Sequence, residues 1–88
     1  MNWEYAITDV AGEHFWTGSG FLPVEEWDLD RQAILCFASE DGARLEVLRQ
    51  RKRGMYLKVV RQLIRQEHGA AYLLAHQDVA DLDSHRLN

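Results

Sequence analysis

The sequence contains a single cysteine, Cys36, so no disulfide can form within the chain, and a reducing compartment is expected. No stretch approaches the ~18 consecutive apolar residues that a membrane span needs. The first ten residues also lack the basic flank and apolar region of a signal peptide. These absences predict a cytoplasmic protein. Because Cys36 stands in the apolar run AILCFA, its thiol is expected to be buried and unreactive.

Motifs of catalysis and ligand binding are also missing. The histidines are scattered, and no CxxC, HxxxH or HExxH spacing occurs; they are His14, His68, His76 and His85. The glycines Gly18 and Gly20 form neither a GxGxxG motif nor a P-loop. The acids of 25–30 match neither a calcium loop nor a paired-carboxylate arrangement. We therefore expect no metal, no cofactor and no enzymatic activity.

What the chain does have is strong segregation of charge. Residues 1–48 carry ten acidic residues and only two basic ones. The stretch 49–65 holds seven of the ten Lys and Arg and no acid, and these seven are the predicted partner-binding residues: Arg49, Arg51, Lys52, Arg53, Lys58, Arg61 and Arg65. The alternative interpretation is a solvated face neutralised by the acids of 25–30.

Hydrophobic patterning predicts a small α+β fold in one domain, 1–88, with an N-terminal antiparallel sheet packed against one or two helices. Alternating apolar residues from Trp3, followed by Gly12 and a second β-favouring run, predict a hairpin over 3–17. The apolar run 33–38 has the length of a central strand covered on both faces. Trp27 is expected to plug the core beneath an acidic loop.

Two helices are predicted after this strand. The first covers about 40–53, with Ser39 as N-cap, acids at its start and basic residues at its end. Its alternative is a tight turn at Asp41-Gly42 followed by a strand. The second covers about 55–68, because polar residues recur there with helical spacing and Gly69 suits a helix stop. Its alternative is a strand from Met55.

The apolar run 70–75 fits either a strand or a short helix, and the acidic tail from Asp78 is expected to be frayed.

Five residues carry a resemblance to other proteins: Ala33, Phe37, Ser39, Glu40 and Asp41. Over 3–48, a Trp-containing hairpin followed by an A-x-x-x-F-x-S strand end and an acidic helix start resembles small bacterial and phage-encoded domains of unassigned function. The resemblance concerns the folding pattern, so it implies neither an active site nor an activity.

Small size, missing catalytic motifs and segregated charge favour a non-enzymatic protein-binding module, a small inhibitor or adaptor. Within that class we expect a phage or mobile-element protein directed at host nucleic-acid machinery, of the anti-CRISPR kind. One alternative is an RNA- or DNA-binding protein that uses the basic helix 49–65, with Tyr56 as a stacking residue. Another is an accessory protein of unknown role. The oligomeric state stays open.

Overall fold

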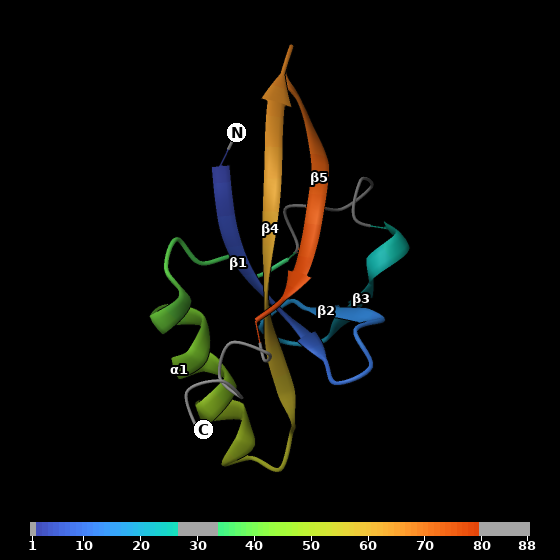
Figure 1. Cartoon of the computed structure of the whole chain (residues 1–88). Coiled ribbons are helices and arrows are strands. Elements are labelled where there is room, and N and C mark those ends of the chain that lie inside the picture. The colour runs from blue at the N-terminus through green and yellow to red at the C-terminus, as the bar shows by residue number, and fades with distance from the viewer. Residues whose placement is uncertain (1, 27–33, 80–88) are drawn as a thin grey trace.

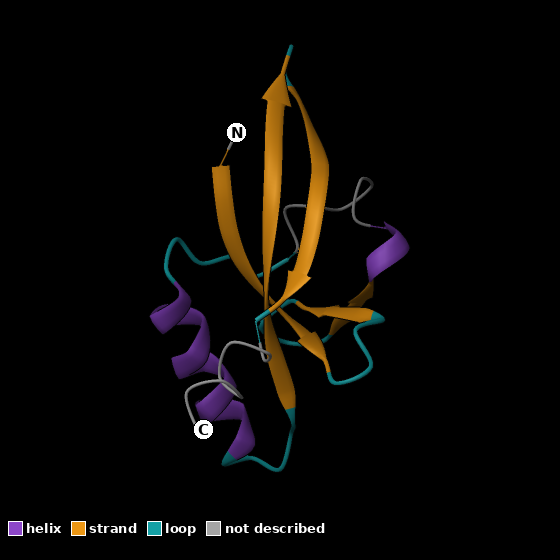
Figure 2. Cartoon of the chain, viewed as in Figure 1, coloured by secondary structure: helices purple, strands orange, loops and turns teal. Residues whose placement is uncertain are grey.

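The computed structural model describes residues 2–26 and 34–79, and it has the α+β class that the patterning predicts (Figure 1). Five strands form one antiparallel sheet in the order β3-β2-β1-β4-β5: β1 Asn2–Asp9, β2 His14–Trp16, β3 Phe21–Pro23, β4 Leu57–Glu67 and β5 Ala70–Asp78. The 3₁₀ turn η1 spans Val24–Glu26, and the helix α1 spans Glu40–Arg51. Figure 2 shows α1 against one side of the sheet.

Two predictions fall wholly or mainly outside this description. Trp27 and the tail beyond Val79 belong to residues that the structure does not describe. No helix in the described part of the chain is long and apolar enough to cross a membrane.

Strands β1 and β2 form the predicted hairpin, with Thr8 paired to Phe15. Gly12 turns the chain at φ 77°, a conformation that favours glycine, and its N–H donates to the Asp9 carbonyl at 3.0 Å. A second tight turn follows β2, in which the Thr17 N–H donates to the Gly20 carbonyl at 2.9 Å. This turn adds the short strand β3 to the edge of the sheet.

Helix α1 confirms the first predicted helix and excludes the alternative turn at Asp41-Gly42. The Ser39 hydroxyl oxygen accepts a hydrogen bond from the Gly42 N–H at 3.2 Å, so Ser39 is the N-cap. Two acids lie in the first turn and two arginines in the last, as the helix dipole favours. Beyond the helix, Gly54 turns the chain at φ 85° towards β4.

The second predicted helix, 55–68, is wrong, because Leu57–Glu67 form β4, the longest strand. Eight residues of β4 pair with β1, and its other edge pairs with β5. Pairing on both edges satisfies the backbone without a helix, and the β-branched Val59, Val60 and Ile64 suit a strand. His68 and Gly69, both at positive φ, make a hairpin turn rather than a helix stop, and the run 70–75 is part of β5.

The predicted central strand at 33–38 is also wrong. Ala33 is outside the described residues. Among the described residues of the run, only Phe37 forms a β-bridge, an isolated one to Tyr5, and the Leu35 N–H donates to the Trp16 carbonyl at 3.2 Å. The middle of the sheet is β1, with β2 on one edge and β4 on the other. Ile34 is buried, but Cys36 is exposed, which contradicts the prediction of a buried thiol.

Both faces of the sheet are covered near its centre. On the α1 side the core consists of Ile7, Trp16, Ala43, Val47, Leu57, Val59 and Val79. On the opposite side it consists of Ala6, Phe15, Ile34, Val60 and Ile64. A buried contact fixes α1 to the sheet: the Glu46 Oε2 accepts from the Trp16 Nε1 at 2.9 Å and from the Gln50 Nε2 at 3.0 Å.

Candidate functional site

The structure distributes the seven predicted binding cations over three elements instead of one helical face. Arg49 and Arg51 lie in the last turn of α1, and Lys52 and Arg53 follow in the turn after it. Lys58, Arg61 and Arg65 lie on β4. Because side chains alternate along a strand, Arg61 and Arg65 share the face on which α1 packs, whereas Lys58 projects from the other face.

The first surface, which we call the basic turn, consists of Arg49, Arg51, Lys52, Arg53 and Tyr56. Arg49 pairs with Glu46 at 3.2 Å, and the Arg51 guanidinium lies 5.9 Å from the Tyr56 ring centroid. Within the described part of the chain, no carboxylate lies at ion-pair distance from Arg51, Lys52 or Arg53. The basic turn therefore exposes uncompensated positive charge beside an aromatic ring.

A groove adjoins the basic turn between α1 and β4, with a volume of about 320 Å³. Its floor is apolar and consists of Val47, Leu57, Val59 and Val79. Arg44 and Arg51 of α1 also line it, and Lys58 of β4 borders it although its side chain lies on the opposite face of the sheet. Arg44 pairs with Glu40 at 2.7 Å and Lys58 with Asp78 at 2.9 Å. We call this the α1–β4 groove.

The second surface, which we call the open sheet face, lies where the sheet extends beyond α1 (Figure 1). It consists of Trp3, Arg61, Leu63, Arg65 and Tyr72. The Arg61 guanidinium lies 4.6 Å from the Trp3 ring centroid, and its Nε donates to the Gln77 Oε1 at 2.8 Å. The Arg65 guanidinium lies 5.5 Å from the Tyr72 ring centroid. Trp3 and Tyr72 keep 43% and 46% of their surface exposed.

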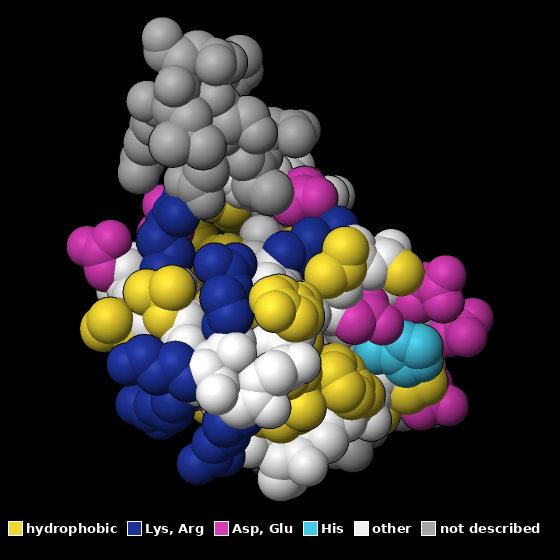
Figure 3. Space-filling model, turned by 90° about the horizontal axis from the view of Figure 1, so that it is seen from below, with side chains coloured by type: hydrophobic (Ala, Val, Ile, Leu, Met, Phe, Trp, Pro, Cys, Tyr) yellow, Lys and Arg dark blue, Asp and Glu magenta, His cyan; other side chains and the backbone are white. Residues whose placement is uncertain are grey.

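The acidic residues of the N-terminal half gather elsewhere. In the view of Figure 3, most Lys and Arg side chains lie to the left and centre and most Asp and Glu side chains lie to the right, with a few acidic side chains among the basic ones. The acids of η1, Glu25 and Glu26, are not the ion-pair partners of the basic stretch. Within the described residues, Arg49 pairs instead with Glu46, Lys58 with Asp78 and Arg65 with Glu67. Neutralisation by the described acids of 25–30 therefore does not occur.

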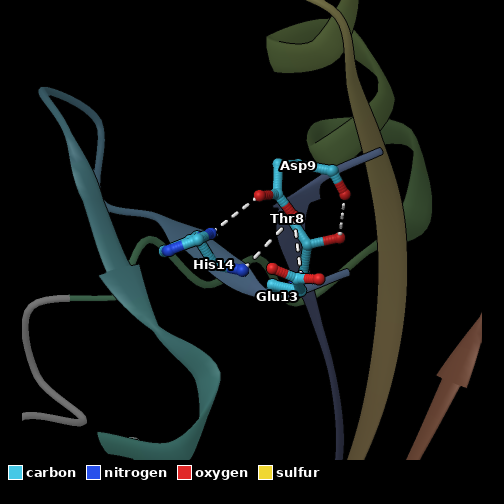
Figure 4. A network of polar contacts seen from close by, with 4 residues as sticks. All are labelled: Thr8, Asp9, Glu13 and His14. Carbon is cyan, nitrogen blue, oxygen red and sulfur yellow. Dashed lines mark hydrogen bonds and ion pairs between the residues drawn. The ribbon is translucent and has the colours of Figure 1, made fainter. Parts of the chain in front are cut away.

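A polar network at the β1–β2 turn belongs to this acidic side (Figure 4). The Asp9 Oδ1 accepts from the backbone N–H groups of Glu13 and His14, and its Oδ2 lies 2.8 Å from the His14 Nδ1. Burial alone would raise the pKa of Asp9, but the hydrogen bonds from the His14 side chain and the two backbone groups lower this pKa below its usual value. The network stabilises the turn, and Glu13 and His14 also line an open pocket of about 420 Å³ together with Pro23, Val24 and Glu25.

The residue types that hold metals or transfer protons are spread over the described part of the chain. They contain no group of three or more His, Cys, Asp and Glu placed to hold a metal ion. His76 stacks on Phe15, with ring centroids 5.8 Å apart, and burial together with nearby Lys58 lowers its pKa. His76 is nevertheless an exposed residue of β5.

Trp3 and Tyr72 are not among the binding residues that the sequence predicts, although both contact arginines of the basic stretch. The available signal was the step-two alternation of Arg61, Leu63 and Arg65, which is typical of one strand face. The helical interpretation of 55–68 concealed it. Comparison of the chain with family models, with curated proteins and with solved structures found no match.

Proposed function

We propose that the chain is a non-enzymatic protein-binding module, a small inhibitor or adaptor, and that the open sheet face is its principal binding surface. The observation that carries this proposal is the pairing of Arg61 with exposed Trp3 and of Arg65 with exposed Tyr72. Trp, Tyr and Arg are the residues that most often dominate the binding energy of protein interfaces. An arginine held over a ring is also partly ordered before binding, so less side-chain entropy is lost.

The test is to identify a partner and then to measure its affinity for surface variants. The intact chain serves as bait for mass spectrometry, and the purified partner is titrated against Trp3→Ala and Arg65→Glu. Each change should weaken binding by about 30-fold if its side chain is a hot spot. Val10→Ala and Glu13→Lys change exposed residues at the distant β1–β2 turn and are the matched controls. Equal affinity of all four variants for the partner would refute the proposal.

One structural observation favours a second candidate, the binding of single-stranded RNA or DNA. Exposed rings beside guanidinium groups also suit stacked bases and phosphates, at the open sheet face and at Tyr56 of the basic turn. In that case a dye-labelled oligonucleotide should bind at ~150 mM salt, and log K should fall by ~0.7 per phosphate contact per tenfold rise in salt. Reversing Arg61 and Arg65 should flatten this slope.

The narrower hypothesis is that the module is phage-encoded, inhibits host nucleic-acid machinery in the anti-CRISPR manner and acts in the cytoplasm. It stays a prediction. The genes that neighbour the coding sequence, together with the identity of the captured protein, test it directly.

A further inference from the structure

The α1–β4 groove combines an apolar floor with positive charge at one end. Its floor is formed by the buried side chains Val47, Leu57, Val59 and Val79, and its volume of about 320 Å³ is at the small end of the ~300–1,000 Å³ range of ligand pockets. Leu48 of α1 also lines it and is 50% exposed. The groove can therefore take an apolar group without a rearrangement of the helix.

The charge at this end of the molecule is not explained by the helix dipole alone. A dipole favours cations in the last turn by ~0.3–1 kcal/mol each, which accounts for Arg49 and Arg51. Lys52 and Arg53 lie beyond that turn, and the described residues offer them no carboxylate. Arg51 lines the groove, and Lys52 and Arg53 follow it directly in the chain; none of these three cations has an ion pair within the described residues.

The aliphatic floor of the groove favours a peptide over a nucleic acid as its ligand. Phosphates and bases gain little from an aliphatic groove, whereas a peptide that carries carboxylates beside a leucine would satisfy both the cations and the groove. We propose that the α1–β4 groove and the basic turn bind an acidic segment of a partner protein that inserts an apolar side chain beside Leu48. This inference rests on the proposed protein-binding function and adds a second surface with a defined partner chemistry.

Peptide titration tests the inference without knowledge of the natural partner. A short dye-labelled peptide of Glu-Glu-Leu repeats is titrated with the intact protein by fluorescence anisotropy. It should bind, whereas peptides of Glu-Glu-Ser and Lys-Lys-Leu repeats should bind at least about tenfold more weakly, because each lacks one half of the complementarity. Equal binding of the Leu and Ser peptides, or no binding of either, would overturn the inference.

Matched variants locate the bound peptide. Leu48→Ser should weaken binding at least about fivefold, because the peptide would bury the half of Leu48 that is exposed in the free protein. Leu45→Ser makes the same change one helical turn earlier, at a side chain that is 65% exposed and outside the groove, and should change binding less than twofold. Arg53→Glu should weaken binding more than Arg65→Glu, which reverses a charge on the open sheet face. Equal effects within either pair would refute the assigned place.

Two further outcomes concern other occupants. The sequence continues after Val79 with Asp81, Leu82 and Asp83, an acidic stretch around a leucine. If the peptide binds only when these three are replaced by Asn, Ser and Asn, the groove belongs to the chain's own segment and the inference is wrong. A dT oligonucleotide that binds more tightly than the Glu-Glu-Leu peptide at ~150 mM salt would likewise overturn it. A negative peptide result leaves the Trp3 and Arg65 test unaffected, so the two proposals fail separately.

Discussion

Replacing Gln62 by methionine should stabilise the protein. Gln62 lies in the middle of β4 with 0% of its surface exposed, and neither its Oε1 nor its Nε2 has a hydrogen-bond partner among the described residues. Each buried polar group without a partner costs ~1–3 kcal/mol of desolvation. Methionine has nearly the same length and shape, removes both polar groups and leaves the packing volume almost unchanged.

The expected gain is about 1–2 kcal/mol in the free energy of unfolding, because relaxation around the amide already recovers part of the full penalty. For a domain of this size, with ~4–13 kcal/mol of total stability, such a gain is readily measured. Urea unfolding followed by tryptophan fluorescence gives the midpoint and the slope m, and only the midpoint should rise.

Gln66→Met is the matched control, because Gln66 lies on the same strand but is exposed to solvent. There the same change removes a solvated amide and should alter stability by less than ~0.5 kcal/mol. A loss of stability in Gln62→Met would refute the reasoning, since it would mean that the buried amide is satisfied in solution. Equal gains in both variants would trace the effect to methionine itself.

Three further predictions follow from the described contacts. Glu46→Ala should cost ~3 kcal/mol in urea unfolding, because it leaves the Trp16 and Gln50 donors buried without an acceptor; a loss below ~0.5 kcal/mol would contradict this network. Cys36 is exposed, so a thiol reagent should label the native protein as fast as the urea-unfolded one, and slow native labelling would show that the thiol is shielded. The pKa of Asp9 is lower in the folded protein than its ordinary value. The ionised Asp9 therefore stabilises the fold at neutral pH, and this stabilisation is lost as the pH falls below ~4 and Asp9 takes up a proton. Asp9→Asn should therefore lower the urea midpoint at pH 6 and flatten its decline below pH 4, and an unchanged decline would exclude this origin.

The elements that the sequence predicts correctly are those with local signals. Gly12 permits the positive φ of the first hairpin, and Ser39 caps α1. Both depend on residues within a few positions of one another, so no knowledge of the tertiary partner is needed. The run at 33–38 lacks such a signal, and its single bridge joins Phe37 to Tyr5 at the edge of β1 that β4 does not occupy, a long-range contact that the local sequence does not reveal.

Gln62 contributes to the incorrect prediction of a helix over 55–68. On a helix it would join Arg61 and Arg65 on one polar face, which completes the amphipathic pattern. As part of β4, its side chain is buried on the same face of the sheet as Val60 and Ile64, where a polar group without a hydrogen bond is costly. Pairing of β4 with both β1 and β5 outweighs that cost, and this gain is not visible in the local sequence.

Because residues 57–65 form a strand and not the predicted helix, the cations of the basic stretch lie farther apart than expected. On one helix its cations would form a single compact face, the arrangement expected for a phosphate backbone. On β4, the distance from Leu57 to Arg65 is about 25 Å at the rise of a strand, so the basic turn and the open sheet face lie near opposite ends of the strand. That separation exceeds the ~8 Å over which surface charges act on one another at physiological salt. The two surfaces can therefore bind different segments without electrostatic interference, and an adaptor needs this independence, whereas a compact phosphate-binding face does not.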